Sequence, residues 1–229
     1  MAAIEACAVI TGGTGGLGSA VTQSMLDAGW HVVVPYHDAS ELSRVERHER
    51  LQLVEADLFE PAAAAEVVAG APAPLRALVN LVGGFAAAGR VHETPIEDFE
   101  RQFRLNLRPT YLMCQAALPL MLEQAQGAIV CVSTRAAVRP FSGAAGYIAS
   151  KAAVLALVDA LAAEYTSDGI RTNAVLPSVI DTPANRASQP DADHSRWVKP
   201  SEIARVIRFL CSEDSAPTSG GHIPVYGRA

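Results

Sequence analysis

The feature that most constrains this chain is an apolar run near its N-terminus that breaks abruptly into glycine. The segment from Val9 to Gly18 reads VITGGTGGLG, and five of its last seven residues are glycine. Glycine loses more conformational freedom on folding than any other residue, so such a run is typical of a backbone that must turn tightly or approach another group closely. The pattern predicts a strand, a glycine turn and then a helix.

A strand, a glycine turn and a helix in this order can form a binding site for the pyrophosphate of a dinucleotide. The glycines allow close approach of the backbone to the phosphates, whose charge lies at the N-terminus of the helix. Taken alone, the pattern fits a plain tight turn equally well. Its spacing is T-G-x-x-x-G-x-G, with Thr11, Gly12, Gly16 and Gly18, rather than G-x-G-x-x-G.

Short β-rich runs alternate with longer helical patterns along the whole chain. Strands are predicted at 6–11, 31–35, 51–55, 77–81, 128–133, 171–176 and 223–225, and helices at 16–27, 41–48, 61–69, 96–104, 107–124, 146–167 and 200–211. Most of these strands are apolar throughout, which is typical of a parallel sheet that is covered on both faces. We therefore predict one α/β domain over 1–229, with a Rossmann-type, doubly wound parallel sheet of about seven strands.

The polar segment 183–197 lacks a clean periodicity. It is predicted to be either disordered or a mobile lid over a site.

Composition narrows the classes of partner. The chain has 229 residues and a net charge of −6, so a basic patch that would attract nucleic acid or an anionic membrane is not expected. Its four widely spaced cysteines indicate buried free thiols in a reducing compartment such as the cytoplasm, and their spacing predicts no metal site. The N-terminus lacks the basic region of a signal peptide, and no apolar run is expected to span a membrane.

Together, the glycine spacing, its position and the chain length resemble the short-chain dehydrogenase/reductase family. The segment GYIASKAAV, 146–154, contains Tyr147 and Lys151 in the Y-x-x-x-K arrangement of that family. Residues four apart share a helix face, and an ammonium beside a phenol lowers the pKa of the phenol. A phenol tuned in this way can exchange a proton with a substrate near neutral pH. An isolated pair would fit an ordinary helix surface, but the glycine motif and the fold pattern support the resemblance independently.

Further segments follow the family's order along nearly the whole chain. LVNLVGG matches the family's N-N-A-G segment at Asn80 and Gly83, and RLNLRPT supplies Asn106, which in the family holds a water beside the lysine. TNAVLPSVIDTP resembles the family's loop near the nicotinamide, with Ser178 in place of a glycine. The resemblance implies cofactor-binding roles for Thr11, Gly12, Gly16, Leu17, Gly18, His37, Asp57, Leu58, Asn80, Gly83, Tyr147, Lys151, Pro177, Ile180 and Thr182, and catalytic roles for Asn106, Thr134, Tyr147 and Lys151.

Two positions depart from the family pattern. The family's catalytic serine stands thirteen residues before the tyrosine, where this chain has Thr134, preceded by Ser133; either hydroxyl can serve. At the end of the second predicted strand, where an acid marks enzymes that use NAD, the chain has Tyr36 and His37. The cofactor is therefore predicted to be NADP or NAD, with NADP slightly favoured, although Asp38 lies close by.

The resemblance implies an oxidoreductase that transfers a hydride between NAD(P)(H) and a small carbonyl or alcohol substrate. It also implies a homodimer or homotetramer built through the predicted helices 107–124 and 146–167. The segment AVLPSVIDTPANRASQPDADHSRW further resembles the dihydropteridine reductases, a group within the family that does not depend on the serine. Two alternatives stay open at this point: reduction of a pterin, and a catalytically silent sensor that only binds the cofactor.

Overall fold

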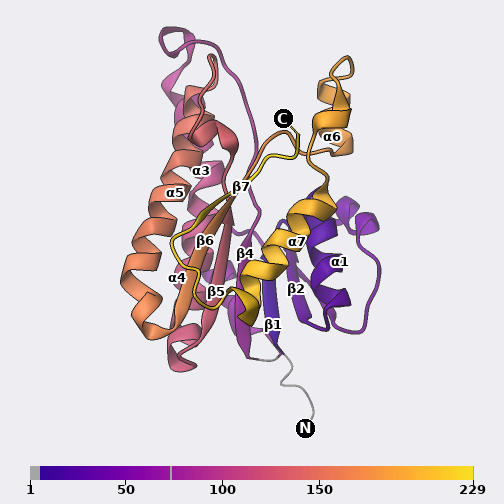
Figure 1. Ribbon diagram of the computed structural model, residues 1–229, viewed down its shortest axis with the longest axis vertical. Helices are drawn as coiled ribbons and strands as arrows, with labels where there is room; N and C mark the ends of the chain where they lie inside the picture. Colours follow the sequence, from indigo (N-terminus) through magenta and orange to yellow (C-terminus); the bar gives the residue numbers. More distant parts are fainter. Residues whose placement is uncertain (1–5, 73, 229) are drawn as a thin grey trace.

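A seven-stranded parallel sheet lies at the centre of the computed structural model, which describes residues 6–72 and 74–228 (Figure 1). The strands are β1 (Cys7–Thr11), β2 (His31–Tyr36), β3 (Leu51–Glu55), β4 (Leu75–Asn80), β5 (Gly127–Val132), β6 (Ile170–Pro177) and β7 (His222–Val225). Their order is β3-β2-β1-β4-β5-β6-β7, and every neighbouring pair is parallel. The strand order reverses between β1 and β4, and the crevice beyond the carboxyl ends of these strands is where such sheets bind ligands.

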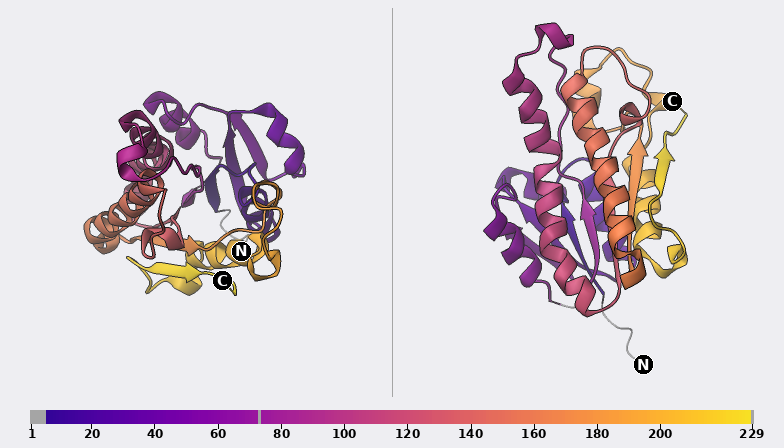
Figure 2. Two further views of the ribbon diagram at one scale, coloured as in Figure 1. Left: turned by 90° about the horizontal axis from the view of Figure 1, so that it is seen from above. Right: turned by 90° about the vertical axis from the view of Figure 1, so that its left-hand side faces the viewer.

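Helices cover both faces of the sheet, as the sequence predicts. They are α1 (Gly18–Asp27), α2 (Pro61–Ala69), α3 (Ile96–Asn106), α4 (Arg108–Glu123), α5 (Ala145–Tyr165), α6 (Pro183–Ser188) and α7 (Pro200–Cys211). The helices α1 and α7 pack together on one face, and α2, α4 and α5 cover the other (Figures 1 and 2). The predicted Rossmann-type architecture is confirmed.

Two segments, one predicted to be a helix and one predicted to be disordered or a mobile lid, differ from expectation in the structure. The helix expected over 41–48 is instead a short 3-10 helix, η1 (Ala39–Arg44), because the carboxylate of Asp38 accepts a hydrogen bond from the amide of Ser40 and starts the helix early. No residue of η1 is buried, so no apolar face extends it into an α-helix. The segment 183–197 contains α6 and a second 3-10 helix, η5 (His194–Arg196), so it is more structured than a featureless loop.

Helix α5 corrects another expectation from the sequence. Together with the residues up to Asp168, it is long and apolar enough, by length and composition, to cross a membrane, although no such run was expected. In the structure it packs against β6 and α3, and its first two turns bury Ser150 and Lys151. We therefore interpret α5 as a core helix of the sheet, whose apolar composition reflects that packing. The four cysteines are buried, as predicted.

Candidate active site

The glycine turn between β1 and α1 has a geometry that side chains would block. Gly12 has a φ of +65°, and a Cβ on Gly18 would collide with the carbonyl oxygen of Gly12. No side chain caps the N-terminus of α1, and its first turn carries no acidic residue. The first amide groups of this helix therefore have no side-chain acceptor, and a helix N-terminus of this kind can bind a phosphate group.

Contacts between distant segments bring the predicted motifs together at the carboxyl ends of the strands. The hydroxyl oxygen of Thr11 accepts hydrogen bonds from the amides of Leu81 (3.1 Å) and Val82 (3.4 Å), which ties the end of β1 to the end of β4. A Cβ on Gly16 would lie 2.9 Å from Cγ2 of Thr182, so the glycine turn touches the loop after β6. Thr11, Gly16 and Thr182, which the resemblance assigns to a dinucleotide site, therefore lie together at this edge of the sheet.

Tyr147 and Thr134 lie close together, Tyr147 in the first turn of α5 and Thr134 directly after β5. The ring of Phe85 packs edge-on against the ring of Tyr147, with 5.0 Å between centroids. Burial raises the pKa of the Tyr147 phenol, and the neighbouring hydroxyl of Thr134 opposes that rise. The phenol is therefore protonated at neutral pH in the free protein, which suits a proton donor.

Lys151 lies one helical turn after Tyr147, and its side chain is only 6% exposed. Its Nζ donates a hydrogen bond to the carbonyl oxygen of Val132 at 3.0 Å. Burial lowers the pKa of the ammonium from 10.5 to about 8. The sequence predicts that this ammonium lowers the pKa of Tyr147, yet the tyrosine pKa is raised, because burial dominates and Nζ is bonded to the strand.

Asn106 is completely buried beside the lysine. Its side chain accepts a hydrogen bond from the amide of Gly84 and donates to the carbonyl oxygen of Gly84 and to the hydroxyl of Ser150. A Cβ on Gly83 would lie 2.6 Å from Oδ1 of Asn106 and 2.9 Å from Nζ of Lys151. The segment after β4 thus passes directly over both polar groups, and only glycine fits there without displacing them.

The two candidate hydroxyls, Ser133 and Thr134, have different contacts in the structure. Ser133 is 3% exposed, and its hydroxyl donates to the carbonyl oxygen of Lys151 at 2.8 Å. This bond fastens the end of β5 to α5. Thr134 reaches Tyr147 and also accepts a hydrogen bond from the amide of Ala136.

Several residues of the predicted cofactor site contact other parts of the protein. The amide nitrogen of Asn80 lies 3.5 Å from the sulfur of Cys114 and 3.7 Å from that of Cys131, so its side chain is a core group. Leu58 is buried in the core. Asp57 is exposed and accepts a hydrogen bond from the amide of Phe59. Any contact of Asn80 with a cofactor would have to come from its backbone.

One polar contact at the glycine turn was missed from the sequence. The hydroxyl of Thr14 donates to a carboxylate oxygen of Glu41 at 2.7 Å, and the other oxygen of Glu41 pairs with Arg44 at 3.0 Å. Glu41 follows Gly18 by 23 residues, near the spacing of about 20 at which dinucleotide-binding folds place the acid that binds the ribose. Glu41 lies beyond the end of β2 in the sequence, and η1 brings its carboxylate back to the glycine turn.

This fold and crevice define an oxidoreductase of the Rossmann type. A family model described as enoyl-(acyl carrier protein) reductase matches residues 12–227. The chain is 31% identical to the 2-(R)-hydroxypropyl-CoM dehydrogenase of Xanthobacter autotrophicus and 31% identical to the 4-formylbenzenesulfonate dehydrogenase of Comamonas testosteroni, in each case over 96% of both proteins. A solved structure of a short chain dehydrogenase/reductase family protein superposes with a TM-score of 0.88 at 31% identity, covering 98% of this chain and 97% of that one.

The chain belongs to the short-chain dehydrogenase/reductase family and is an NAD(P)-dependent oxidoreductase.

Proposed function

We propose that this protein reduces a small carbonyl compound, or oxidises the corresponding alcohol, with Tyr147 as the acid or base. The observation that carries the proposal is the buried Lys151 one helical turn after Tyr147, with the side chain of Thr134 beside the phenol. When bound, the nicotinamide cofactor exchanges the hydride with the substrate. Tyr147 donates its proton to the carbonyl oxygen as charge develops there, and Thr134 orients that oxygen.

A cavity beside Tyr147 supports a small substrate. It has a volume of about 290 Å³ and is lined by Ala86, Ala88, Phe99 and Ala144, among others. This volume is just below the usual range for small-molecule sites, which suits a small substrate. The relatives fit a small substrate as well, since they are named as dehydrogenases of 2-hydroxypropyl-CoM, 4-formylbenzenesulfonate and D-threitol. A screen of short ketones, aromatic aldehydes and quinonoid dihydropterin, each with NADH and with NADPH, tests the proposal.

Thr134 is proposed as the hydroxyl that assists Tyr147, while Ser133 has a structural role. We expect Thr134→Val to lower turnover of a ketone by about 10²-fold, because a hydrogen-bond donor to the developing oxyanion is lost. Ser133→Ala should leave turnover within a few-fold of the wild type and reduce the free energy of unfolding by about 1 kcal/mol, for the lost bond to Lys151. Steady-state kinetics and urea denaturation of both variants measure these effects.

A larger loss of turnover in Ser133→Ala than in Thr134→Val would reverse the assignment. Dihydropterin turnover that survives replacement of both residues by alanine would instead favour the dihydropteridine reductase resemblance, because a quinonoid imine needs only the hydride and one proton.

The residues present fit a dinucleotide, and the preference between its two forms depends on two opposing groups. His37 is exposed after β2, where an imidazolium would favour the 2′-phosphate of NADP(H). The carboxylate of Glu41, held at the glycine turn by Thr14, disfavours that phosphate. We retain the proposal of a modest preference for NADP(H), which should strengthen on acidification and weaken in high salt.

Replacing Glu41 with glutamine is expected to tighten NADPH binding relative to NADH by about threefold or more. The change removes one negative charge near the ribose and keeps a hydrogen-bond acceptor for Thr14. Dissociation constants for both cofactors at pH 6 and pH 8 measure the shift, with the exposed Glu46→Gln as the charge-matched control. An unchanged ratio in Glu41→Gln would contradict this role, and tighter NADH binding by the wild type at both pH values would refute the NADP(H) preference.

We also propose that the protein forms a homo-oligomer through α4 and α5. The outer side of α5 presents Ala156, Ala160 and Ala163, small exposed residues on one helical face. On the neighbouring α4, Tyr111 is 51% exposed. An open groove lined by Tyr111, Ala153 and others runs between the two helices. The three exposed alanines of α5 would allow a second helix to pack closely against it.

A further inference from the structure

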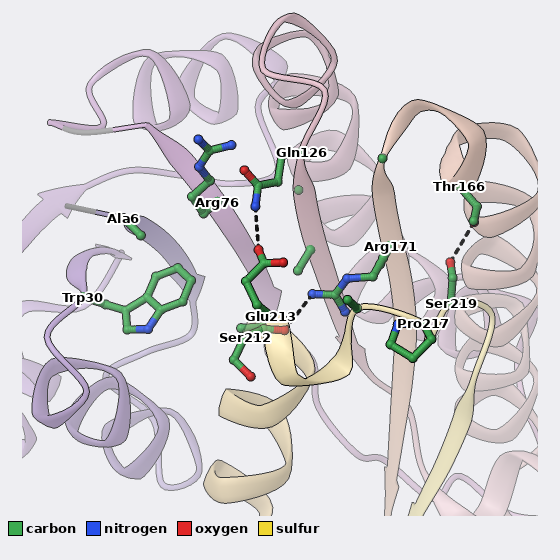
Figure 3. A pocket seen from close by; sticks show the side chains of 15 residues that line it. Ala6, Trp30, Arg76, Gln126, Thr166, Arg171, Ser212, Glu213, Pro217 and Ser219 are labelled. Atoms are coloured by element: carbon green, nitrogen blue, oxygen red, sulfur yellow. Dashed lines mark hydrogen bonds between the residues drawn. The ribbon is translucent and has the colours of Figure 1, made fainter. Parts of the chain in front are cut away.

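A second cavity lies at the opposite end of the sheet from the candidate active site. It has a volume of about 580 Å³, within the range of small-molecule sites. Its walls come from the residues before β1 and β2, from the starts of β4, β5 and β6, and from the residues after α7 (Figure 3). Because these are the amino ends of the strands, the cavity is separate from the crevice that holds Tyr147.

One of the two arginines in this cavity, Arg171, is held in place by hydrogen bonds within the protein. Nη1 of Arg171 donates to the carbonyl oxygen of Leu210 (2.9 Å) and to the hydroxyl of Ser215 (2.7 Å), and Nη2 donates to the carbonyl oxygen of Ser212 (3.0 Å). These bonds hold the segment after α7 against β6. Arg171 therefore forms a fixed wall of the cavity.

The other arginine, Arg76, has a buried hydrogen-bond donor without an acceptor among the described residues. Arg76 projects from β4 into the lining, and its Nη1 is buried without a hydrogen-bond partner among the described residues (Figure 3). None of the ion pairs found in the described part of the chain involves Arg76. A buried donor of a charged group without an acceptor is costly, and a carboxylate is the acceptor that best matches a guanidinium.

The charged side chains that line the cavity have a positive net charge. Glu213 is the acidic residue of the lining, and one of its oxygens accepts a hydrogen bond from the amide of Gln126 at 2.5 Å. Burial raises the pKa of the Cys211 thiol to about 12, so it is neutral. Two arginines and one glutamate give a net charge of +1. The half-buried indole of Trp30 stands across the cavity from Arg171 and offers a flat apolar surface (Figure 3).

We propose that this cavity binds a small planar carboxylate, with its anionic end against Arg76 and its ring against Trp30. The carboxylate supplies the acceptor that the guanidinium lacks and neutralises the excess charge, and the indole face stacks on the ring. The site is independent of the proposed hydride transfer, since it shares no lining residue with the crevice at the carboxyl ends.

Binding of 4-nitrobenzoate to the purified protein tests this site, by quenching of tryptophan fluorescence and by calorimetry. We expect saturable binding that is at least about tenfold weaker for the neutral 4-nitrobenzamide and for Arg76→Met, since each removes one partner of a charge-assisted pair. Arg205→Met, an exposed arginine on α7, is the charge-matched control and should bind as the wild type does. Saturating NADH should leave the affinity unchanged.

Equal binding of the acid and the amide by the wild type would overturn the proposal, as would displacement of 4-nitrobenzoate by NADH or the absence of saturable binding. If Arg76→Met does not fold, the comparison of acid and amide on the wild type still decides the role of charge. Trp30→Leu then tests the stacking surface, and an affinity equal to that of the wild type would exclude Trp30 as the ring contact.

Discussion

Replacing Tyr147 with phenylalanine is expected to lower turnover by at least about 10²-fold while the cofactor still binds. The substitution keeps the edge-on packing of the ring against Phe85 and deletes only the phenol hydroxyl beside Thr134. Loss of a general acid typically costs 10²- to 10⁴-fold in rate. Turnover of a substrate found in the carbonyl screen and the dissociation constants of NADH and NADPH measure the two parts of this prediction.

A matched control is available on the same helix. Tyr165 lies at the C-terminal end of α5, far along the helix from Tyr147, and Tyr165→Phe should leave turnover unchanged. Near-normal turnover of Tyr147→Phe would remove Tyr147 from the mechanism. It would also revive the alternative of a cofactor-binding sensor whose phenol has no catalytic role.

Replacing Lys151 with methionine is expected to weaken both turnover and cofactor binding and, at the same time, to stabilise the free protein. In the free protein the ammonium is buried, and its pKa falls from 10.5 to about 8. Each pKa unit corresponds to about 1.4 kcal/mol, so burial of this charge costs the folded state roughly 3 kcal/mol at neutral pH. Methionine fills a similar volume without the charge, and we expect a gain of about 1–3 kcal/mol in the free energy of unfolding at pH 7.

The gain in the free energy of unfolding of Lys151→Met should shrink as the pH rises above about 8. Below about pH 8 the lysine is protonated in both states, so the full cost is present. Between pH 8 and 10.5 the unfolded chain binds more protons than the folded one, the wild type gains stability, and the advantage of the methionine variant shrinks. Urea denaturation at pH 7 and pH 10 measures this difference, with the exposed Lys199→Met as control. A methionine variant less stable than the wild type at pH 7 would contradict the prediction.

Family membership and architecture follow from local patterns in the sequence. Apolar strands, the glycine turn and the Y-x-x-x-K pair each depend on residues close together in the chain, and all of them are where the sequence places them. The boundaries of α2 and α7 were predicted to the residue, because proline starts both helices and α7 carries a regular apolar face. The segment after β2 was mispredicted, because its helix depends on a cap rather than on periodicity.

The sequence by itself determined the kind of fold and which residues could take part in the chemistry. Only the tertiary structure decided what each of them contacts. It directs the hydroxyl of Ser133 to helix α5 and that of Thr134 to Tyr147, although the two residues are adjacent in the chain. It also brings Glu41 to the glycine turn and leaves a nitrogen of Arg76 without an acceptor. Spacing along the chain fixes a residue's element and face, whereas hydrogen bonds, burial and pKa depend on which distant segments pack against it.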